Sequence, residues 1–349
     1  MVANQKLSPE DQNRLMKGPS KKNTEPKDFY SDFTLEKLDS FGDRESLKNM
    51  VTHVKNYNSM LAEQITFINT PLSAAIPFTR ENLYLICAYT GNGKSTIAAN
   101  ISYPLWKEKK KILIITNEET ESDVLFRISC LDLNLSFNDW KKGLMGPDDQ
   151  LRVMQNFPTI AQYVKVVDVN AGKGMTTKIE GIKQVLTEAK GGGYSCALID
   201  YYQLVKYSLA DHTRSTYDVL NDLRTWLGTY IKGCEIPVVL FAQLYSMGKR
   251  QSKDIDARIK ECTAVNEPAT VIIEAIPNMD ELTTDFIIHK DRFGYAGMKI
   301  TCAFEKGRYV RLTEEHKRRV TELKLNKLTK DIADLSKPIL VDGGGRKDD

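Results

Sequence analysis

The residues best suited to chemistry stand together at positions 88–96, where the chain reads AYTGNGKST. Gly91 and Gly93 let the backbone curl, so that successive N–H groups point inward at a phosphate. Lys94 would then reach the β- and γ-phosphates of ATP, and the Ser95 hydroxyl would hold a Mg²⁺ ion. The types and spacing of these residues therefore predict a phosphate-binding P-loop.

The predicted P-loop lies in the setting that its chemistry requires. An apolar run at 83–87 precedes it as a strand, and a helix begins near Ser95 and adds the positive end of its dipole. The generic pattern begins with Gly where this chain has Ala88. The alternative, a glycine-rich turn that binds nothing, does not explain the strand–loop–helix setting. The residues expected to cradle the nucleotide are Ala88, Thr90, Gly91, Asn92, Gly93, Lys94, Ser95 and Thr96.

Hydrolysis of a nucleotide also requires an acid that faces the Mg²⁺ ion. Asp200 meets this need, because it ends an apolar run at 196–200, where a carboxylate can face the metal held by Ser95. Taken alone, an Asp after a strand is usually only a turn residue. With a P-loop upstream in the chain, the metal role is the better interpretation.

A base that orients the attacking water is the remaining requirement. Glu118 follows the strand expected at 111–116, which puts it beside the γ-phosphate if that strand neighbours the P-loop strand. Glu119 and Glu121 compete for the role. The alternative interpretation of Glu118 is a solvent-exposed acid that caps the next helix.

Strands alternate with helices through the rest of the chain. This pattern predicts a mostly parallel α/β sheet that is covered by helices on both faces. The expected strands are 83–87, 111–116, 164–169, 196–200, 237–241, 271–275, 285–289, 298–304 and 308–312. The expected helices are about 95–106, 122–130, 176–189, 216–232 and 314–335, with a looser helical region at about 139–157.

Composition excludes several classes of protein. The chain of 349 residues is 41% hydrophobic and 27% charged, which is ordinary for a globular protein with a sizeable core. A net charge of +3 is too weak to indicate nucleic acid by itself. The cysteines show no CxxC pair and suit buried, reduced thiols, and the histidines lack metal-ligand spacing. Without a signal peptide or an apolar stretch long enough to span a membrane, we expect a cytoplasmic protein with no membrane partner.

The two ends of the chain differ from its centre. Residues 1–32 are polar and lysine-rich, which predicts a flexible N-terminal arm. Residues 33–66 show helical spacing of apolar residues. They form either a helical pair with its own core or a linker helix that docks onto a neighbouring subunit. The main domain is expected at 67–312, and residues 313–349 as a C-terminal helix and tail.

The order of the motifs carries a family resemblance. The chain reads LIITNEET at 113–120, IDYYQLV at 199–205, FAQL at 241–244, IKECTAVNEPA at 259–269 and HKDRFGYAG at 289–297, and it ends its core with a hairpin. In this order they resemble the RecA-like motor domain of DnaB-type replicative helicases and the helicase half of phage primase-helicases. Ala88 is expected in that family, whereas Thr90 and Ser95 are mild departures.

The resemblance assigns roles to several residues. It implies that Glu118 is the catalytic glutamate, that Asp200 holds the metal, and that Gln243 senses the γ-phosphate. It further implies that Lys290 and Arg292 reach into the nucleotide site of the next subunit, with Arg292 as an arginine finger. A finger supplied by another copy requires a homo-oligomer, for which a head-to-tail ring, a hexamer in this family, is the closed solution. The alternative is that both cations only solubilise an exposed sheet edge.

Contact with single-stranded DNA is expected in the basic segment from Tyr245 to Lys260, with 206–214 as a second candidate. Basic, flexible loops suit sequence-independent tracking of a phosphate backbone, although a charge run is often only solvated. The residues expected to contact DNA are Lys249, Arg250, Lys253, Arg258 and Lys260.

The resemblance implies an ATP- and Mg²⁺-dependent helicase of a phage, plasmid or other mobile element, acting in the host cytoplasm. Because the N-terminal region is short, the chain is expected to be a minimal motor that meets a separate primase or helicase loader. Two alternatives stay open: a RecA- or RadA-like recombination ATPase on DNA, and a protein of the same fold that uses nucleotide only as a switch.

Overall fold

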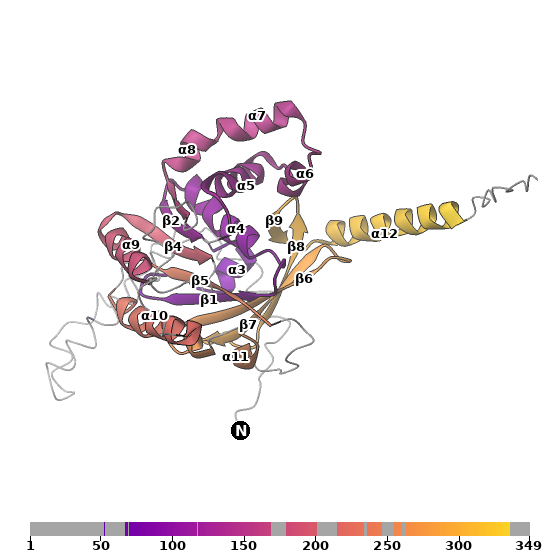
Figure 1. The fold of residues 1–349 in the computed structure, drawn as a ribbon. Coiled ribbons are helices and arrows are strands. Elements are labelled where there is room, and N and C mark those ends of the chain that lie inside the picture. The colour runs from indigo at the N-terminus through magenta and orange to yellow at the C-terminus, as the bar shows by residue number, and fades with distance from the viewer. Residues whose placement is uncertain are drawn as a thin grey trace, which may run out of the picture.

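The computed structural model describes residue 52 and the ranges 67–68, 70–116, 118–168, 179–200, 215–233, 236–245, 255–259 and 263–335. Within these ranges the chain forms one large sheet with helices on both faces (Figure 1). Four expected parts of the chain lie outside them: the N-terminal arm, nearly all of the helical segment at 33–66, the first residues of the helix at 176–189, and the last residues of the C-terminal tail.

The sheet contains nine strands in the spatial order β3-β2-β4-β5-β1-β6-β7-β8-β9. Neighbouring strands from β3 to β6 run parallel, and β7, β8 and β9 continue the sheet as an antiparallel extension. The predicted mostly parallel sheet is confirmed. The strands are β1 (Leu83–Ala88), β2 (Lys111–Thr116), β3 (Val164–Asp168), β4 (Tyr194–Asp200), β5 (Val238–Gln243), β6 (Val271–Asn278), β7 (Thr283–Asp291), β8 (Lys299–Glu305) and β9 (Arg308–Arg311).

Two hydrophobic clusters bury the two faces of the sheet. One packs α3, α4 and α5 on the side chains of one face, and the other packs α9, α10 and α11 on the opposite face (Figure 1). Every residue of β1 is buried, as expected for a central parallel strand that reads as a continuous apolar run. The helices are α3 (Thr70–Ala75), α4 (Lys94–Lys107), α5 (Glu121–Leu133), α6 (Phe137–Lys141), α7 (Pro147–Gln155), α8 (Phe157–Ala161), α9 (Ile179–Gly191), α10 (Thr216–Tyr230), α11 (Ile255–Arg258) and α12 (Glu314–Leu335).

The position of β2 differs from the arrangement that would place Glu118 beside the P-loop strand. β2 pairs with β3 and β4, so β4 and β5 lie between it and β1. Helix α4, which packs on one face of the sheet, connects β1 to β2, and β2 lies beyond both of these strands. The condition for placing Glu118 beside the P-loop strand, that the two strands are neighbours, is therefore not met. Glu118 instead follows the strand that adjoins β4, the strand that ends in Asp200.

The looser helical region expected at 139–157 consists of the short helices α6, α7 and α8. Gly143 has a positive φ of 70°, and Pro147 opens α7, so the backbone turns twice in this stretch. Aromatic rings pack α6 and α8 against Phe126 of α5, with Phe126 and Trp140 stacked at a centroid distance of 4.0 Å.

The C-terminal helix α12 has the predicted bounds and projects away from the sheet (Figure 1). His316 anchors its first turn. The His316 ring is buried, with Nδ1 2.9 Å from a Glu305 carboxylate oxygen and Nε2 3.1 Å from the Glu281 carbonyl oxygen. Among the described helices, none is long and apolar enough to cross a membrane.

Candidate nucleotide site

The P-loop connects β1 to α4 and takes the backbone shape that its glycines predict. Gly91 and Gly93 have φ angles of 78° and 82°, in the left-handed region that residues with a side chain avoid. The Asn92 N–H donates to the Tyr89 carbonyl oxygen at 3.1 Å and closes the turn. α4 begins at Lys94, and its N-cap, Gly93, supplies no side-chain hydrogen bond. The first N–H groups of the helix therefore face the loop, where an anion can accept from them.

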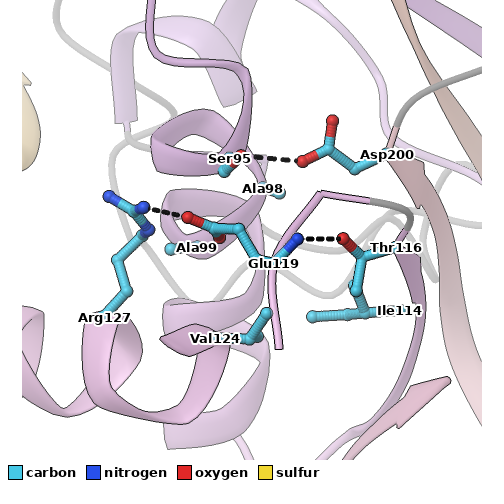
Figure 2. A pocket seen from close by; sticks show the side chains of 9 residues that line it. All are labelled: Ser95, Ala98, Ala99, Ile114, Thr116, Glu119, Val124, Arg127 and Asp200. Atoms are coloured by element: carbon cyan, nitrogen blue, oxygen red, sulfur yellow. Dashed lines mark hydrogen bonds and ion pairs between the residues drawn. The ribbon is translucent and has the colours of Figure 1, made fainter. Parts of the chain in front are cut away.

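Ser95 and Asp200 meet across the end of the sheet. The Ser95 hydroxyl donates to Oδ2 of Asp200 at 2.9 Å (Figure 2). Asp200 ends β4, and only β5 separates this strand from the P-loop strand β1. Lys94, which precedes Ser95, is also buried, with 5% of its surface exposed. The structure thus brings together the residues that the sequence predicted for phosphate and metal.

The environment of Asp200 suits a cation. Asp200 is 3% exposed, and burial raises the pKa of its carboxyl to about 7; the charge of nearby Glu118 adds to this, while the Ser95 hydrogen bond and Lys94 oppose it. Its second oxygen, Oδ1, is buried and accepts no hydrogen bond from any described residue. A hydroxyl and an orphaned carboxylate oxygen are hard oxygen ligands of the kind Mg²⁺ takes. The residues present fit a Mg²⁺ ion.

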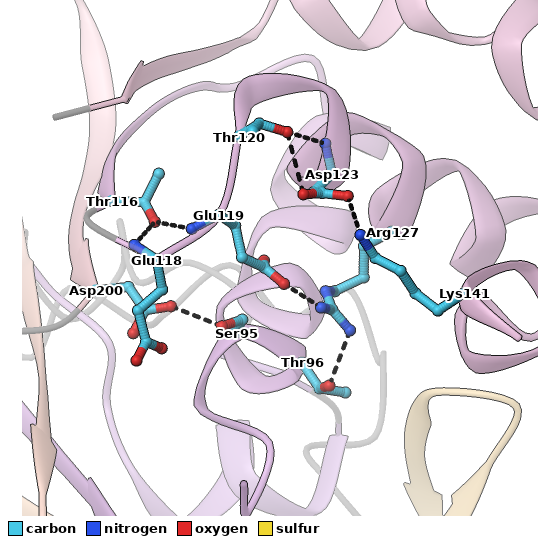
Figure 3. Close-up of polar contacts among 10 residues, drawn as sticks. All are labelled: Ser95, Thr96, Thr116, Glu118, Glu119, Thr120, Asp123, Arg127, Lys141 and Asp200. Atoms are coloured by element: carbon cyan, nitrogen blue, oxygen red, sulfur yellow. Dashed lines mark hydrogen bonds and ion pairs between the residues drawn. The ribbon is translucent and has the colours of Figure 1, made fainter. Parts of the chain in front are cut away.

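Glu118 and Glu119 point in different directions after β2. The Thr116 hydroxyl accepts hydrogen bonds from both of their N–H groups, at 3.3 and 3.2 Å. The exposed side chain of Glu118 extends toward Asp200, whereas Glu119 forms an ion pair with Arg127 (Figure 3). Glu118 is therefore the acid that keeps an exposed carboxylate near Asp200, whereas Glu119 is held by Arg127.

Arg127 is a residue of this site that the sequence reasoning did not single out. From α5 its guanidinium binds Glu119, donates to the Thr96 hydroxyl at 3.3 Å and lies 3.8 Å from the centre of the Phe137 ring. It thus joins the start of α4 to the segment that carries Glu118. Arg127 and Glu119 also line the same small pocket as Ser95 and Asp200 (Figure 2). In the sequence, the only sign of the ion pair between Glu119 and Arg127 is that the two opposite charges are eight residues apart.

Gln243 ends β5, where it lies opposite Ala88 in the sheet register. Its side-chain amide donates to the hydroxyl of Thr90 in the P-loop. The residue that the resemblance predicted as a sensor thus contacts the phosphate-binding loop directly, through a side chain at the carboxyl end of the neighbouring strand.

Lys290 and Arg292 lie near the first residues of β1, at the opposite end of that strand from the P-loop. The Arg292 N–H donates to Thr270, whose own N–H donates to Leu83 at the first residue of β1. Both cations cap the same turn: Lys290 donates to the carbonyl oxygens of Asn266 and Glu267, and Arg292 donates to that of Glu267. The structure does not bring these two cations to the nucleotide site of their own chain.

The basic residues expected to contact DNA divide into two groups. Lys249, Arg250, Lys253 and Lys260 lie outside the described residues. Arg258, in contrast, points inward: it is bound through both terminal nitrogens by Glu274, a partner that the sequence reasoning missed. Its assignment as a DNA contact remains a prediction that has to account for this ion pair.

The parallel sheet, with a glycine loop after a central strand and a buried acid facing it, defines the chain as a RecA-like ATPase fold. The family model described as DnaB-like helicase C-terminal domain matches residues 73–314. Because this match covers more than half of the chain, the chain belongs to that family. It is therefore a DnaB-type helicase domain, and the family implies an ATP-dependent helicase.

Solved structures agree with the fold. One similar chain is described as an ATPase domain, with a TM-score of 0.62, 17% identity, and coverage of 78% of this chain and 99% of that one. Another comes from a structure titled as a DnaB-like replicative helicase and its interactions with primase, with a TM-score of 0.62, 17% identity, and coverage of 78% and 67%. No curated protein sequence matches the chain.

Proposed function

We propose that this protein is a ring-forming DNA helicase that hydrolyses ATP at subunit interfaces and moves along single-stranded DNA. The observation that carries the proposal is the hydrogen bond of 2.9 Å between Ser95 and Asp200, beside an exposed Glu118. A phosphate loop, a metal ligand and a candidate base then share one end of the sheet. A protein that only binds nucleotide does not need the base.

Each residue of the site has a distinct task in this proposal. Lys94 and the N–H groups at the start of α4 bind the β- and γ-phosphates, and Ser95 and Asp200 hold the Mg²⁺ ion. The ion, when bound, neutralises charge on the phosphate oxygens. Glu118 accepts a hydrogen bond from the attacking water and orients it toward the γ-phosphate. Gln243, through Thr90, responds to the presence of that phosphate.

The position of Arg292 supports a site completed by a second copy of the chain. β1 has six residues, which at about 3.3 Å each separate its two ends by about 20 Å. An arginine side chain cannot span that distance to its own P-loop. A head-to-tail contact would bring Arg292 to a P-loop, because it sets the side of one subunit that carries Arg292 against the P-loop side of the next. Repeated around an axis, the contact closes a ring, which we propose to be a hexamer.

The proposed partners follow from the same motor. Single-stranded DNA would pass through the ring against the basic segment that contains Lys249, Arg250 and Lys253. One of the similar solved structures is described by its interactions with primase, and we propose a primase or a helicase loader as a partner here too. The setting we propose is replication of a phage or plasmid in the cytoplasm of its host.

Mixed rings of two inactive variants test the shared site. Lys94→Ala removes the phosphate contact of a subunit's own site, and Arg292→Ala removes the finger it lends to its neighbour. When both variants are co-expressed and purified together, random mixing leaves about one quarter of the interfaces with both groups intact. We expect ATP hydrolysis to recover to about that share of the wild-type rate, although each variant alone is inactive.

The matched control is Arg152→Ala, which removes an exposed arginine of α7 that pairs only with Asp149 among the described residues. Co-expressed with Lys94→Ala, it should contribute active interfaces and lower the rate only in proportion to the inactive subunits. If the mixture of Lys94→Ala and Arg292→Ala stays inactive while this control mixture is active, Arg292 does not act across an interface and the proposal fails.

A further inference from the structure

Glu274 is a buried acid that the proposed reaction does not use. It lies on β6 opposite Cys87 of the P-loop strand, with 1% of its surface exposed. Two terminal nitrogens of Arg258 donate to its two oxygens, each at 2.6 Å, and Nε2 of His289 donates to one of them at 2.8 Å. We call Arg258, Glu274 and His289 the Glu274 cluster. Its three residues come from α11, β6 and β7.

The cluster keeps a charge where burial disfavours one. Burial acts to raise the pKa of Glu274, but the hydrogen bonds from His289 and Arg258 outweigh it and hold the pKa below its usual range. Buried ion pairs contribute little net stability compared with apolar residues of similar volume, and their best-attested use is to fix one arrangement over others. A bidentate pair fixes both distance and orientation. The cluster is thus suited to holding Arg258 in one position.

Gln243 lies just before the basic segment, and Arg258 lies near its end. Leu244 forms a bridge with Ile259, and the Tyr245 N–H donates to the Arg258 carbonyl oxygen at 2.9 Å. The chain therefore returns to its starting point, and the residues 246–254, with Lys249, Arg250 and Lys253, connect the two ends.

Both ends contact the P-loop, at consecutive residues. Gln243 donates to the Thr90 hydroxyl, and Arg258 approaches the Tyr89 hydroxyl oxygen at 3.4 Å. The two residues that flank 246–254 are therefore both in contact with the loop that binds nucleotide in the proposed function. His289 also links the Glu274 cluster to the proposed subunit interface, because the next residue in the chain is Lys290, one of the cations proposed to serve the next subunit.

We propose that Arg258, Glu274 and His289 are positioning residues that couple the basic segment to the P-loop, so that bound single-stranded DNA accelerates ATP turnover. Arg258 acts in this account through its ion pair and its contact with Tyr89, not as a ligand of DNA phosphate. The inference rests on the proposed function, because it assumes that the segment at 246–254 binds DNA.

The test compares the full chain with two variants that keep the size of the cluster. Glu274→Gln removes the charge that holds Arg258, and Arg258→Lys keeps the charge but cannot form the two parallel hydrogen bonds. Lys299→Gln is the control, since it breaks an exposed ion pair with Asp285 on the same sheet. For each protein we would measure kcat and KM for ATP without DNA and with saturating oligo-dT, and the affinity for oligo-dT by fluorescence anisotropy.

We expect both cluster variants to bind oligo-dT and ATP with constants near those of the wild type, and to lose about fivefold or more of the acceleration by DNA, as a coupling free energy of ordinary size implies. A cluster that only stabilises the fold would alter thermal unfolding and leave the acceleration in the folded fraction unchanged, which would overturn the inference. So would a weaker affinity for oligo-dT with full acceleration at saturation, because Arg258 would then be a DNA ligand.

Arg258→Lys keeps the inference testable if Glu274→Gln does not fold, since it retains the buried charge pair. Failure of the proposed function gives a different result. In that case the wild-type protein hydrolyses ATP no faster than Lys94→Ala, or shows no response to oligo-dT at all, before any cluster variant is compared.

Discussion

Replacing Asp200 with asparagine should stabilise the nucleotide-free protein at alkaline pH while it abolishes Mg²⁺-dependent hydrolysis. In the folded chain the pKa of Asp200 is about 7, whereas the ordinary value is 3.8. Between these two values the folded state holds a proton that the unfolded state has released. The free energy of unfolding therefore falls as the pH rises through this window, and the loss is complete above pH 7.

The magnitude follows from the width of the window. Each pH unit well inside it costs the wild type about 1.4 kcal/mol, so the step from pH 5 to pH 8.5, above the folded pKa, costs about 3 kcal/mol. The substituted asparagine would not titrate. Its amide nitrogen would replace an oxygen that accepts no hydrogen bond from the described residues, at a cost of about 1–3 kcal/mol that is the same at every pH. The advantage of Asp200→Asn over the wild type should thus grow by about 3 kcal/mol between pH 5 and pH 8.5.

Urea unfolding followed by circular dichroism at pH 5, 6, 7 and 8.5, without Mg²⁺ or nucleotide, measures this difference. Asp280→Asn is the control, because Asp280 is an exposed acid in the turn between β6 and β7. A difference between Asp200→Asn and the wild type that stays constant over this range would refute the reasoning, since it would mean that Asp200 is charged in the folded protein at pH 5.

Two further predictions concern other parts of the chain. Glu118→Gln should lower kcat for ATP by about 100-fold or more with KM within a few-fold, as loss of a general base implies, whereas Glu119→Gln should affect kcat far less; steady-state kinetics of both variants decides, and equal losses would show that the two acids were assigned wrongly. His316→Ala removes the contacts to Glu305 and to the Glu281 carbonyl oxygen, and should loosen the attachment of α12 by about 1–3 kcal/mol. Amide exchange at 314–320 should accelerate accordingly, and unchanged exchange there would contradict the anchoring role.

The sequence was sufficient for the features that depend on local pattern. The parallel strands β1, β2, β4 and β5 are almost wholly buried, so they read as apolar runs whose ends could be predicted within a few residues. The P-loop could be predicted because its glycines, lysine and hydroxyl follow one another in the chain. Asp200 could be predicted because its place at a strand end follows from the apolar run before it.

The features that could not be predicted depend on the order of the strands in the sheet and on pairs of residues that are distant in sequence. Nothing in the residues at 111–116 states that β4 and β5 come between β2 and β1, so the neighbour of Glu118 could not be deduced. The spacings of Glu118 and Glu119 to every motif differ by only one residue, and the structure distinguishes the two acids by the ion pair between Glu119 and Arg127. Arg258 looked like part of a solvated charge run because its partner, Glu274, lies on another element.

The most direct test of the proposed function is strand separation on a forked DNA substrate with ATP and Mg²⁺, with Lys94→Ala as the control. The proposal predicts that the wild-type protein releases the displaced strand and that Lys94→Ala does not. ATP hydrolysis that is stimulated by single-stranded DNA without any strand release, or strand release that survives Lys94→Ala, would contradict it.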